Sequence, residues 1–260
     1  MSNAAIVYLN LADDGVITAS SSIVQAPPST VQDPHVARRW RSLGASSEFL
    51  LCDLGSSQSI DVIALFGLNM DVLGLSRVRI STVDATGVAG DAYDSTTLAG
   101  QVEDDYDCLI DVLPAPVTGR YVRIDLANTG LAYIEAGRLV VGLQNVLDIN
   151  FASGWSRRFV DRARKTESRG GQIYIDHDVT YRILNLTFEH VTADQRYGFI
   201  EQIDLLNGAS TDILVLTNPA SATLGRDSIW GLVEEVSSVT QSFVSNPARF
   251  QKSFQIRERL

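Results

Sequence analysis

Short segments of the first 145 residues alternate between apolar and polar side chains, and turn-forming residues separate these segments. SRVRIST (76–82) and RYVRIDL (120–126) show the alternation most clearly. A period of two is typical of a strand that buries one face. The other predicted strands of this part cover residues 4–10, 15–21, 48–55, 59–70, 106–113 and 133–143. Such spacing, with polar turns and no long helical pattern, predicts an antiparallel β-sandwich or barrel.

The pattern changes after residue 145, where the predicted strands flank a single helix. Thr192 and Gln195 fit a capping box, a common start of a helix. Gly208 is a typical helix end. Between them, apolar residues recur at helical spacing at Phe199, Ile200, Ile203 and Leu206. The sequence therefore predicts a mainly β protein: a sandwich of residues 1–145, and a smaller β domain of residues 146–260 with one helix at about 192–207.

The balance of charge also changes at nearly the same place. Of the net charge of −10, residues 1–146 carry −9, from 8 basic and 17 acidic side chains, and residues 147–260 carry −1, from 13 basic and 14 acidic side chains. Binding to a phosphate backbone needs concentrated Lys and Arg, so the charge argues against a nucleic-acid partner. The sequence also lacks the long apolar run of a membrane span and the leader pattern of a secreted protein. We expect Cys52 and Cys108 to be free buried thiols rather than a disulfide, as in a protein made in a reducing cytoplasm.

No constellation in the sequence carries catalytic chemistry. His35, His177 and His190 are expected at turns or strand ends, and neighbouring strand residues point to opposite faces, so these side chains would not converge. The acidic run 103–107 offers oxygen ligands for calcium but lacks a specific spacing, and a solvated acidic turn is the favoured interpretation. Neither a nucleophile motif nor a phosphate-binding or zinc motif occurs. We expect no enzyme activity, no cofactor and no metal.

Three loops bring aromatic and basic side chains to candidate binding positions, and one of them is the short loop at 128–130 that Tyr133 follows. A proline-rich loop at 25–34 precedes a tryptophan between two arginines, and a long acidic segment at 85–103 contains a tyrosine. The candidate ligand-binding residues are Trp40, Arg41, Tyr93 and Tyr133. We expect these loops to gather at one end of the sandwich as a shallow surface on which a sugar ring stacks. The alternative for Trp40 is a structural anchor in the core.

A concentration of basic residues lies at the start of the second part. The candidate partner-interface residues are Arg157, Arg158, Arg162 and Arg164. Alternation places part of this set on one strand face, where it suits an acidic partner surface. The alternative is a solvated strand face balanced by Asp161 and Glu167.

Five segments of the first part, taken in order, resemble the discoidin, or galactose-binding-like, domain. They are RRWRS (38–42), LLCDLGSSQSIDVIALFGLN (50–69), RVRIS (77–81), GRYVRIDL (119–126) and IEAGRL (134–139). The resemblance implies a jelly-roll β-sandwich, with carbohydrate or lipid head groups bound by loops at one end. No particular set of sugar-binding residues is matched.

The second part resembles tail-tip proteins of long non-contractile-tailed bacteriophages, in the layout of distal-tail proteins. The segments that carry this resemblance are FASGWSRRFVD (151–161), GGQIYID (170–176), the capped helix, ILVLTNP (213–219), SIWGLV (228–233) and FQKSFQIRE (250–258). It implies a β domain that assembles into a ring around the tail channel, in a protein made in the host cytoplasm and located in the virion tail.

These observations lead to a structural protein of a phage tail tip or baseplate that contacts other tail proteins and forms homo-oligomers. Its first domain would dock another protein or touch the host surface. The main alternative is a carbohydrate-binding module that recognises a cell-surface glycan. A hydrolase is a third class, and it would need a pair of carboxylates that the sequence does not single out.

Overall fold

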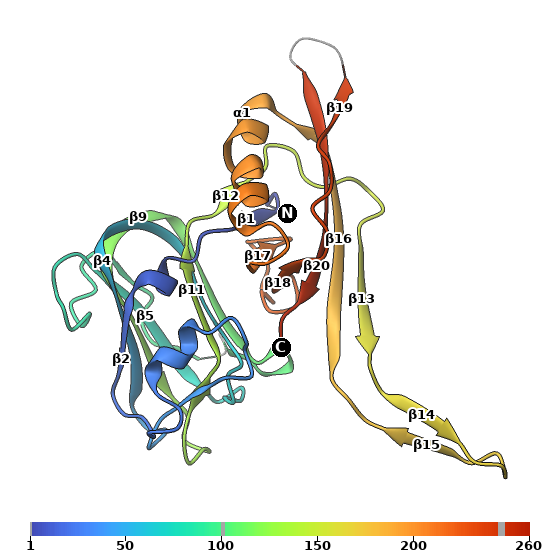
Figure 1. Ribbon diagram of the computed structural model, residues 1–260. Helices are drawn as coiled ribbons and strands as arrows, with labels where there is room; N and C mark the ends of the chain where they lie inside the picture. The colour runs from blue at the N-terminus through green and yellow to red at the C-terminus, as the bar shows by residue number, and fades with distance from the viewer. Residues whose placement is uncertain (1, 100–101, 244–247) are drawn as a thin grey trace. The chain divides into compact units, whose positions relative to one another are not determined.

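The computed structural model describes residues 2–99, 102–243 and 248–260, and it is mainly β (Figure 1). Two compact units are present, and the chain passes between them more than once. Unit 1 contains Met1–Val146, Leu214–Ser228 and Leu260, and unit 2 contains Leu147–Ile213 and Ile229–Arg259. The first boundary lies next to the one expected from the sequence. The sequence placed residues 214–228 in the second domain, whereas in the structure they pack with unit 1.

Unit 1 is a jelly-roll β-sandwich built around two long antiparallel strands, β4 (Glu48–Phe66) and β9 (Cys108–Ala127). Their register shifts between Asp53 and Gln58 and again between Ile60 and Val62, and the two strands curve together (Figure 1). The sheet order is β11-β4-β9-β5-β6, with β2 on β4, β7 on β5 and β8 on β9. The further strands of this sheet are β2 (Val16–Ala19), β5 (Leu75–Ser81), β6 (Tyr93–Asp94), β7 (Leu98–Ala99), β8 (Val102–Glu103) and β11 (Arg138–Gly142).

The predicted alternation is realised in the core of unit 1. Val78 and Ile80 of β5 and Val122 and Ile124 of β9 are buried on the same core cluster. Short 3-10 turns cover one part of the sandwich, at η1 (Leu11–Asp14) and η2 (Pro28–Gln32), and a third, η3 (Asp104–Tyr106), precedes β9. The predicted β-sandwich is confirmed.

The returning segment 214–228 completes unit 1 by strand pairing. Residues 214–216 of β17 (Ile213–Leu216) pair with β1 (Ala5–Val7), which also pairs with β12 (Asn145–Val146). Farther along, the Gly225 amide donates to Glu103 Oε1 at 2.7 Å. A Cβ on Gly225 would lie 2.6 Å from the Cys108 sulfur, so only glycine fits here. The segment belongs to unit 1 because residues 214–216 are fully buried where they pair with β1 and Gly225 packs against Glu103 and Cys108.

Unit 2 is a smaller antiparallel sheet with one helix. The sheet order is β18-β20-β16-β13, and β19 pairs with β20. Its strands are β13 (Ser156–Asp161), β16 (Thr180–Val191), β18 (Ser228–Val233), β19 (Thr240–Phe243) and β20 (Arg249–Glu258), with a separate ribbon of β14 (Arg164–Glu167) and β15 (Ile173–Asp176). Phe188, Phe254 and Ile256 are buried in its core.

The helix predicted at about 192–207 is confirmed, although its turns are wider than expected. It begins with α1 (Ala193–Gln195), capped by the predicted box of Thr192 and Gln195, and continues through the π-helical segments η4 (Arg196–Ile200) and η5 (Ile203–Asn207). The backbone of Gly198 departs from helical geometry, with φ −86° and ψ −119°, so the helix is kinked there. Leu206, predicted on the apolar face, is 55% exposed, because the buried face runs through Ile200, Ile203 and Asn207 instead. None of the described helices has the length and apolar content needed to cross a membrane.

Candidate functional site

The first candidate surface lies on the two-stranded pair of β3 (Trp40–Arg41) and β10 (Glu135–Ala136) in unit 1. Trp40 is opposite Ala136, and Arg41 is opposite Glu135. Side chains alternate between the two faces of a strand. Trp40 and Ala136 are therefore both fully buried in the core, and the charged pair faces outward.

The charged pair is held in a defined geometry. Arg41 Nε donates to Glu135 Oε1 at 2.7 Å, and this hydrogen bond raises the pKa of Arg41. The Arg41 guanidinium lies over the Tyr133 ring, 4.1 Å from its centroid. Arg39 Nη1 is 3.6 Å from Glu135 Oε2. Arg39, Arg41 and Glu135 line a hollow of about 530 Å³ together with Ile23, Ala26 and Ala37.

The backbone around this hollow is fixed by Asn69. Its side-chain amide donates to the Tyr133 carbonyl at 3.1 Å, and its Oδ1 accepts the Glu135 amide at 2.8 Å. On the other side, the Arg41 amide donates to the Ala26 carbonyl at 3.2 Å. The sequence singled out Arg41 and Tyr133 and missed Arg39, Asn69 and Glu135, because partners this far apart in the chain are brought together only by the fold.

The placement of Trp40 corrects the expectation that its ring stacks on a ligand. The side chain is fully buried, and its Nε1 donates to the Ser21 carbonyl at 2.9 Å. A ring enclosed in the core presents no face to a sugar. Trp40 takes the structural role that the sequence left open.

Tyr93 also makes its contacts inside the sandwich of unit 1. Its hydroxyl donates to Asp111, with oxygen distances of 3.1 and 3.3 Å, and its ring packs against the core cluster. Burial raises the pKa of Asp111, which is 6% exposed. Among the described residues no contact joins Tyr93 to Arg41 or Tyr133, so the four predicted ligand residues do not form a single surface.

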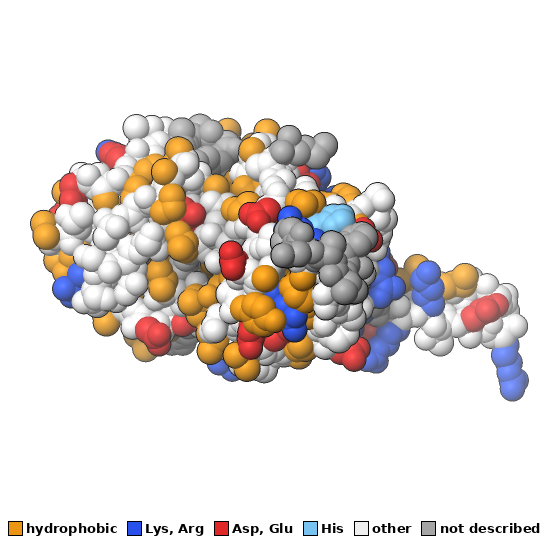
Figure 2. Space-filling view, turned by 90° about the horizontal axis from the view of Figure 1, so that it is seen from above, with side chains coloured by type: hydrophobic (Ala, Val, Ile, Leu, Met, Phe, Trp, Pro, Cys, Tyr) orange, Lys and Arg blue, Asp and Glu red, His pale blue; other side chains and the backbone are white. Residues whose placement is uncertain are grey.

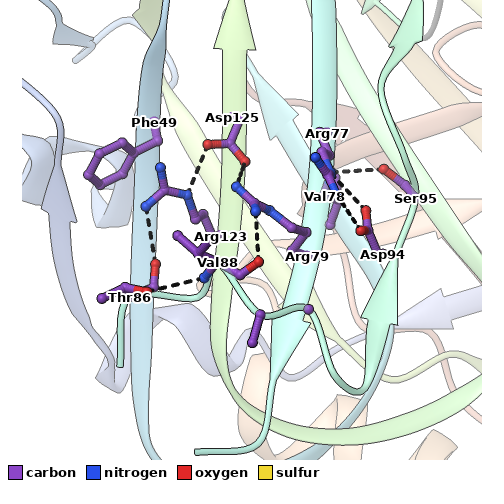
Figure 3. A network of polar contacts seen from close by, with 12 residues as sticks. Phe49, Arg77, Val78, Arg79, Thr86, Val88, Asp94, Ser95, Arg123 and Asp125 are labelled. Atoms are coloured by element: carbon purple, nitrogen blue, oxygen red, sulfur yellow. Dashed lines mark hydrogen bonds and ion pairs between the residues drawn. The ribbon is translucent and has the colours of Figure 1, made fainter. Parts of the chain in front are cut away.

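A second hollow of about 260 Å³ opens where β4, β5 and β9 begin or end. Arg77, Arg79, Glu48 and Asp125 are among its lining residues. Figure 3 shows the adjoining network, in which Arg79 and Arg123 share Asp125. Arg79 Nη1 also donates to the Val88 carbonyl at 2.7 Å. These hydrogen bonds hold the start of the acidic segment 85–103 against β5 and β9, whereas the sequence analysis predicted only a surface loop there.

The basic segment of unit 2 leads into a projecting hairpin. β13 pairs with β16, and β14 pairs with β15 in the same hairpin. We call residues 162–179 the arm. All eight residues of β14 and β15 are exposed, and Figure 2 shows hydrophobic and basic side chains side by side on the projecting segment. Arg157 and Arg158 lie on β13, Arg162 is 3.8 Å from Asp178, and Arg164 is opposite Asp176.

The cysteines, the histidines and the acidic run were also singled out from the sequence. Both cysteines are free and buried, as predicted, and burial raises the pKa of Cys52 to about 12. His35 Nδ1 contacts Asp33 at 2.9 Å. No group of three or more potential His, Cys, Asp or Glu metal ligands occurs within the described ranges of the chain. In the acidic run 103–107, Glu103 accepts the Gly225 amide described above.

Comparison with solved structures finds carbohydrate-binding modules. The chain is similar to the lectin domain of lectinolysin in complex with Lewis B antigen, with 14% identity, 51% of this chain and 95% of that chain covered, and a TM-score of 0.41. It is also similar to a fucose-binding module of Streptococcus pneumoniae, with 14% identity, 52% and 98% coverage and a TM-score of 0.41. A chitosan-binding module of a chitosanase/glucanase from Paenibacillus sp. IK-5 shows 23% identity, 51% and 98% coverage and a TM-score of 0.40. No family model and no curated protein matches.

Proposed function

We propose that the protein is a structural protein that assembles with neighbouring subunits through the arm of unit 2. The observation that carries this proposal is the exposure of Ile173, Tyr174 and Ile175, at 65%, 61% and 50%. A two-stranded ribbon is marginally stable by itself, and contiguous exposed apolar side chains are typical of interaction sites. The edges of the ribbon also leave backbone groups open to pairing with another chain.

The partners proposed for the arm are further copies of this chain and other proteins of a bacteriophage tail tip or baseplate. The resemblance of the second part to distal-tail proteins supports this assignment. In this proposal the protein is made in the host cytoplasm, resides in the virion tail and has no catalytic role. Gold-labelled antibodies against the chain should bind the tail end of purified virions, and labelling of the capsid alone would contradict the assignment.

Replacing Ile173 and Ile175 together by threonine should weaken assembly, because the change removes one apolar face of the arm while keeping β-branched side chains. In light scattering over a range of concentrations, we expect the unaltered chain to form oligomers. The variant should need at least about tenfold higher protein concentration to reach the same fraction of oligomer, since a loss of about 1.4 kcal/mol lowers an association constant tenfold.

The matched control replaces Val83 and Val88 of unit 1 by threonine, because these valines are 83% and 51% exposed and lie outside the arm. The control should assemble like the unaltered chain. An unaltered chain that stays monomeric, or equal assembly by both variants, would refute assembly through the arm.

A second function, glycan binding by unit 1, is favoured by the surface around Arg41, Tyr133 and Glu135. A few convergent polar groups beside apolar lining are typical of a small-ligand site. Here a guanidinium, a carboxylate and an aromatic ring meet at a hollow also lined by Ile23 and Ala26. The carbohydrate-binding module is therefore kept as the alternative function, and it is compatible with assembly through unit 2.

Tyr133→Ala should abolish most glycan binding, because it removes both the ring and the support of Arg41. A glycan array probed with the unaltered chain and with this variant measures the effect, and we expect at least about a tenfold loss of signal, the size produced by about 1.4 kcal/mol. Tyr174→Ala on the arm is the control and should bind normally. If the unaltered chain binds no glycan on the array, or if Tyr133→Ala binds as well as the unaltered chain, glycan binding at this surface is contradicted.

A further inference from the structure

The hollow beside β3 and β10 carries an excess of positive charge within an acidic part of the chain. Three of the 8 basic side chains in residues 1–146 are Arg38, Arg39 and Arg41. Arg38 has its own acid, because its Nη1 is 2.8 Å from Asp33. Arg39 and Arg41 share a single carboxylate, Glu135. One guanidinium charge at the hollow is therefore left without a matching acid.

The two arginines differ in how firmly Glu135 holds them. Arg41 is fixed by the 2.7 Å bond from its Nε and by its position over the Tyr133 ring. Arg39 reaches Glu135 only at 3.6 Å, and its side chain is 32% exposed. Within the parts of the chain that the structure describes, no group accepts a hydrogen bond from Nη1 of Arg41. Donors from both guanidiniums are thus open to a ligand.

We propose that this hollow binds a sugar that bears a carboxylate, as in a uronic acid. The proposal rests on the glycan-binding function proposed above for unit 1. Guanidinium groups match the planar geometry of a carboxylate, and charge-assisted hydrogen bonds are stronger than neutral ones. The sugar ring would lie against the apolar side of the hollow, formed by Ile23, Ala26 and Ala37.

The second hollow of unit 1 also contains arginines, but it lacks the excess of positive charge found at the hollow beside β3 and β10. Its lining contains Arg77 and Arg79, but also the carboxylates Glu48 and Asp125. Asp94 adds a further acid at 2.5 Å from Arg77 Nη2. Arg123, which shares Asp125 with Arg79, brings the number of guanidiniums in this network to three. Glu48, Asp94 and Asp125 supply three carboxylates, so the charges around this hollow balance. The same residue types therefore favour different ligands in the two places.

Titration calorimetry at low ionic strength, with trigalacturonate and its methyl ester as probes, tests the proposal. The two probes share the sugar rings and differ in charge. We expect trigalacturonate to bind about tenfold or more tightly than the ester, since each factor of ten corresponds to about 1.4 kcal/mol. Arg39→Gln should weaken trigalacturonate binding about tenfold, and Glu135→Gln should strengthen it, because the competing carboxylate is removed.

Arg120→Gln is the matched control. Arg120 is 37% exposed, forms an ion pair with Asp53 and lies on β9, so the change alters net charge equally without touching the hollow. Affinity should stay within about twofold of the unaltered chain, as expected for an exposed charge. An equal loss in Arg39→Gln and Arg120→Gln would show a general charge effect and overturn the site.

The remaining outcomes separate the failure of this inference from failure of glycan binding. Equal affinity for trigalacturonate and its ester would overturn the anionic preference and leave glycan binding standing. Binding of neither probe would overturn the inference, and the glycan array would then decide glycan binding independently. Triglutamate binding as tight as trigalacturonate, with the same response to Arg39→Gln, would show recognition of charge without the sugar and overturn the assignment of a saccharide.

Discussion

Replacing Asp204 by alanine is expected to destabilise unit 2 by about 3 kcal/mol, the lower end of the cost of leaving a buried charge without its partner, because the side chain of Asp204 is itself 25% exposed. Lys252 of β20 is 1% exposed, and its Nζ lies 2.7 Å from both carboxylate oxygens of Asp204. The same Nζ donates to the Ser237 carbonyl at 2.7 Å. Asp204 belongs to the second π-helical segment, so the pair joins the helix to the sheet of unit 2.

Urea unfolding followed by tryptophan fluorescence measures this effect. Trp155 and Trp230 report on unit 2, and a Trp40→Phe background removes the signal of unit 1. The control combines Asp204→Ala with Lys252→Met. Removing the buried charge of Lys252 together with its partner is often close to neutral, so the double variant should recover most of the loss. A loss below about 1 kcal/mol in Asp204→Ala would place the pair in the range of exposed salt bridges and contradict a stabilising role at the buried Lys252.

Trp40→Ala is expected to destabilise unit 1 by about 3–5 kcal/mol, the usual cost of truncating a large buried aromatic side chain. Trp40 is fully buried, packs in the core cluster and donates its indole hydrogen bond to Ser21. The truncation leaves a cavity and removes the donor to the Ser21 carbonyl. Loss of ligand binding in this variant would report unfolding, and for this reason Tyr133 and Arg39 are the better tests of the binding surface.

Hydrogen exchange of peptides from β4 and β9 measures the effect on unit 1 without needing tryptophan fluorescence. Exchange through opening of the sandwich should accelerate strongly in Trp40→Ala and much less in Trp40→Phe, which keeps an aromatic ring in the core. Peptides from β16 and β20 should be unchanged and serve as the internal control. Unchanged protection in β4 and β9 would contradict a core role for Trp40.

The sequence by itself determined the local elements, because their signals act between near neighbours. Alternation in RYVRIDL (120–126) predicted a strand with one buried face, and β9 has that face. The capping box at Thr192 predicted the start of the helix, because its two hydrogen bonds join residues three positions apart. The mainly β class followed from the same short-range patterns.

Only the tertiary structure decided which distant segments meet. Glu135 stands opposite Arg41, β17 joins β1, and Lys252 meets Asp204, and no local pattern encodes any of these partners. Trp40 lies next to arginines in the sequence, yet its position opposite Ala136 turned its ring into the core. The physical reason is that burial and ion pairing depend on which side chains are close together in the folded chain. Residues far apart in the sequence become neighbours only when the whole sheet has formed.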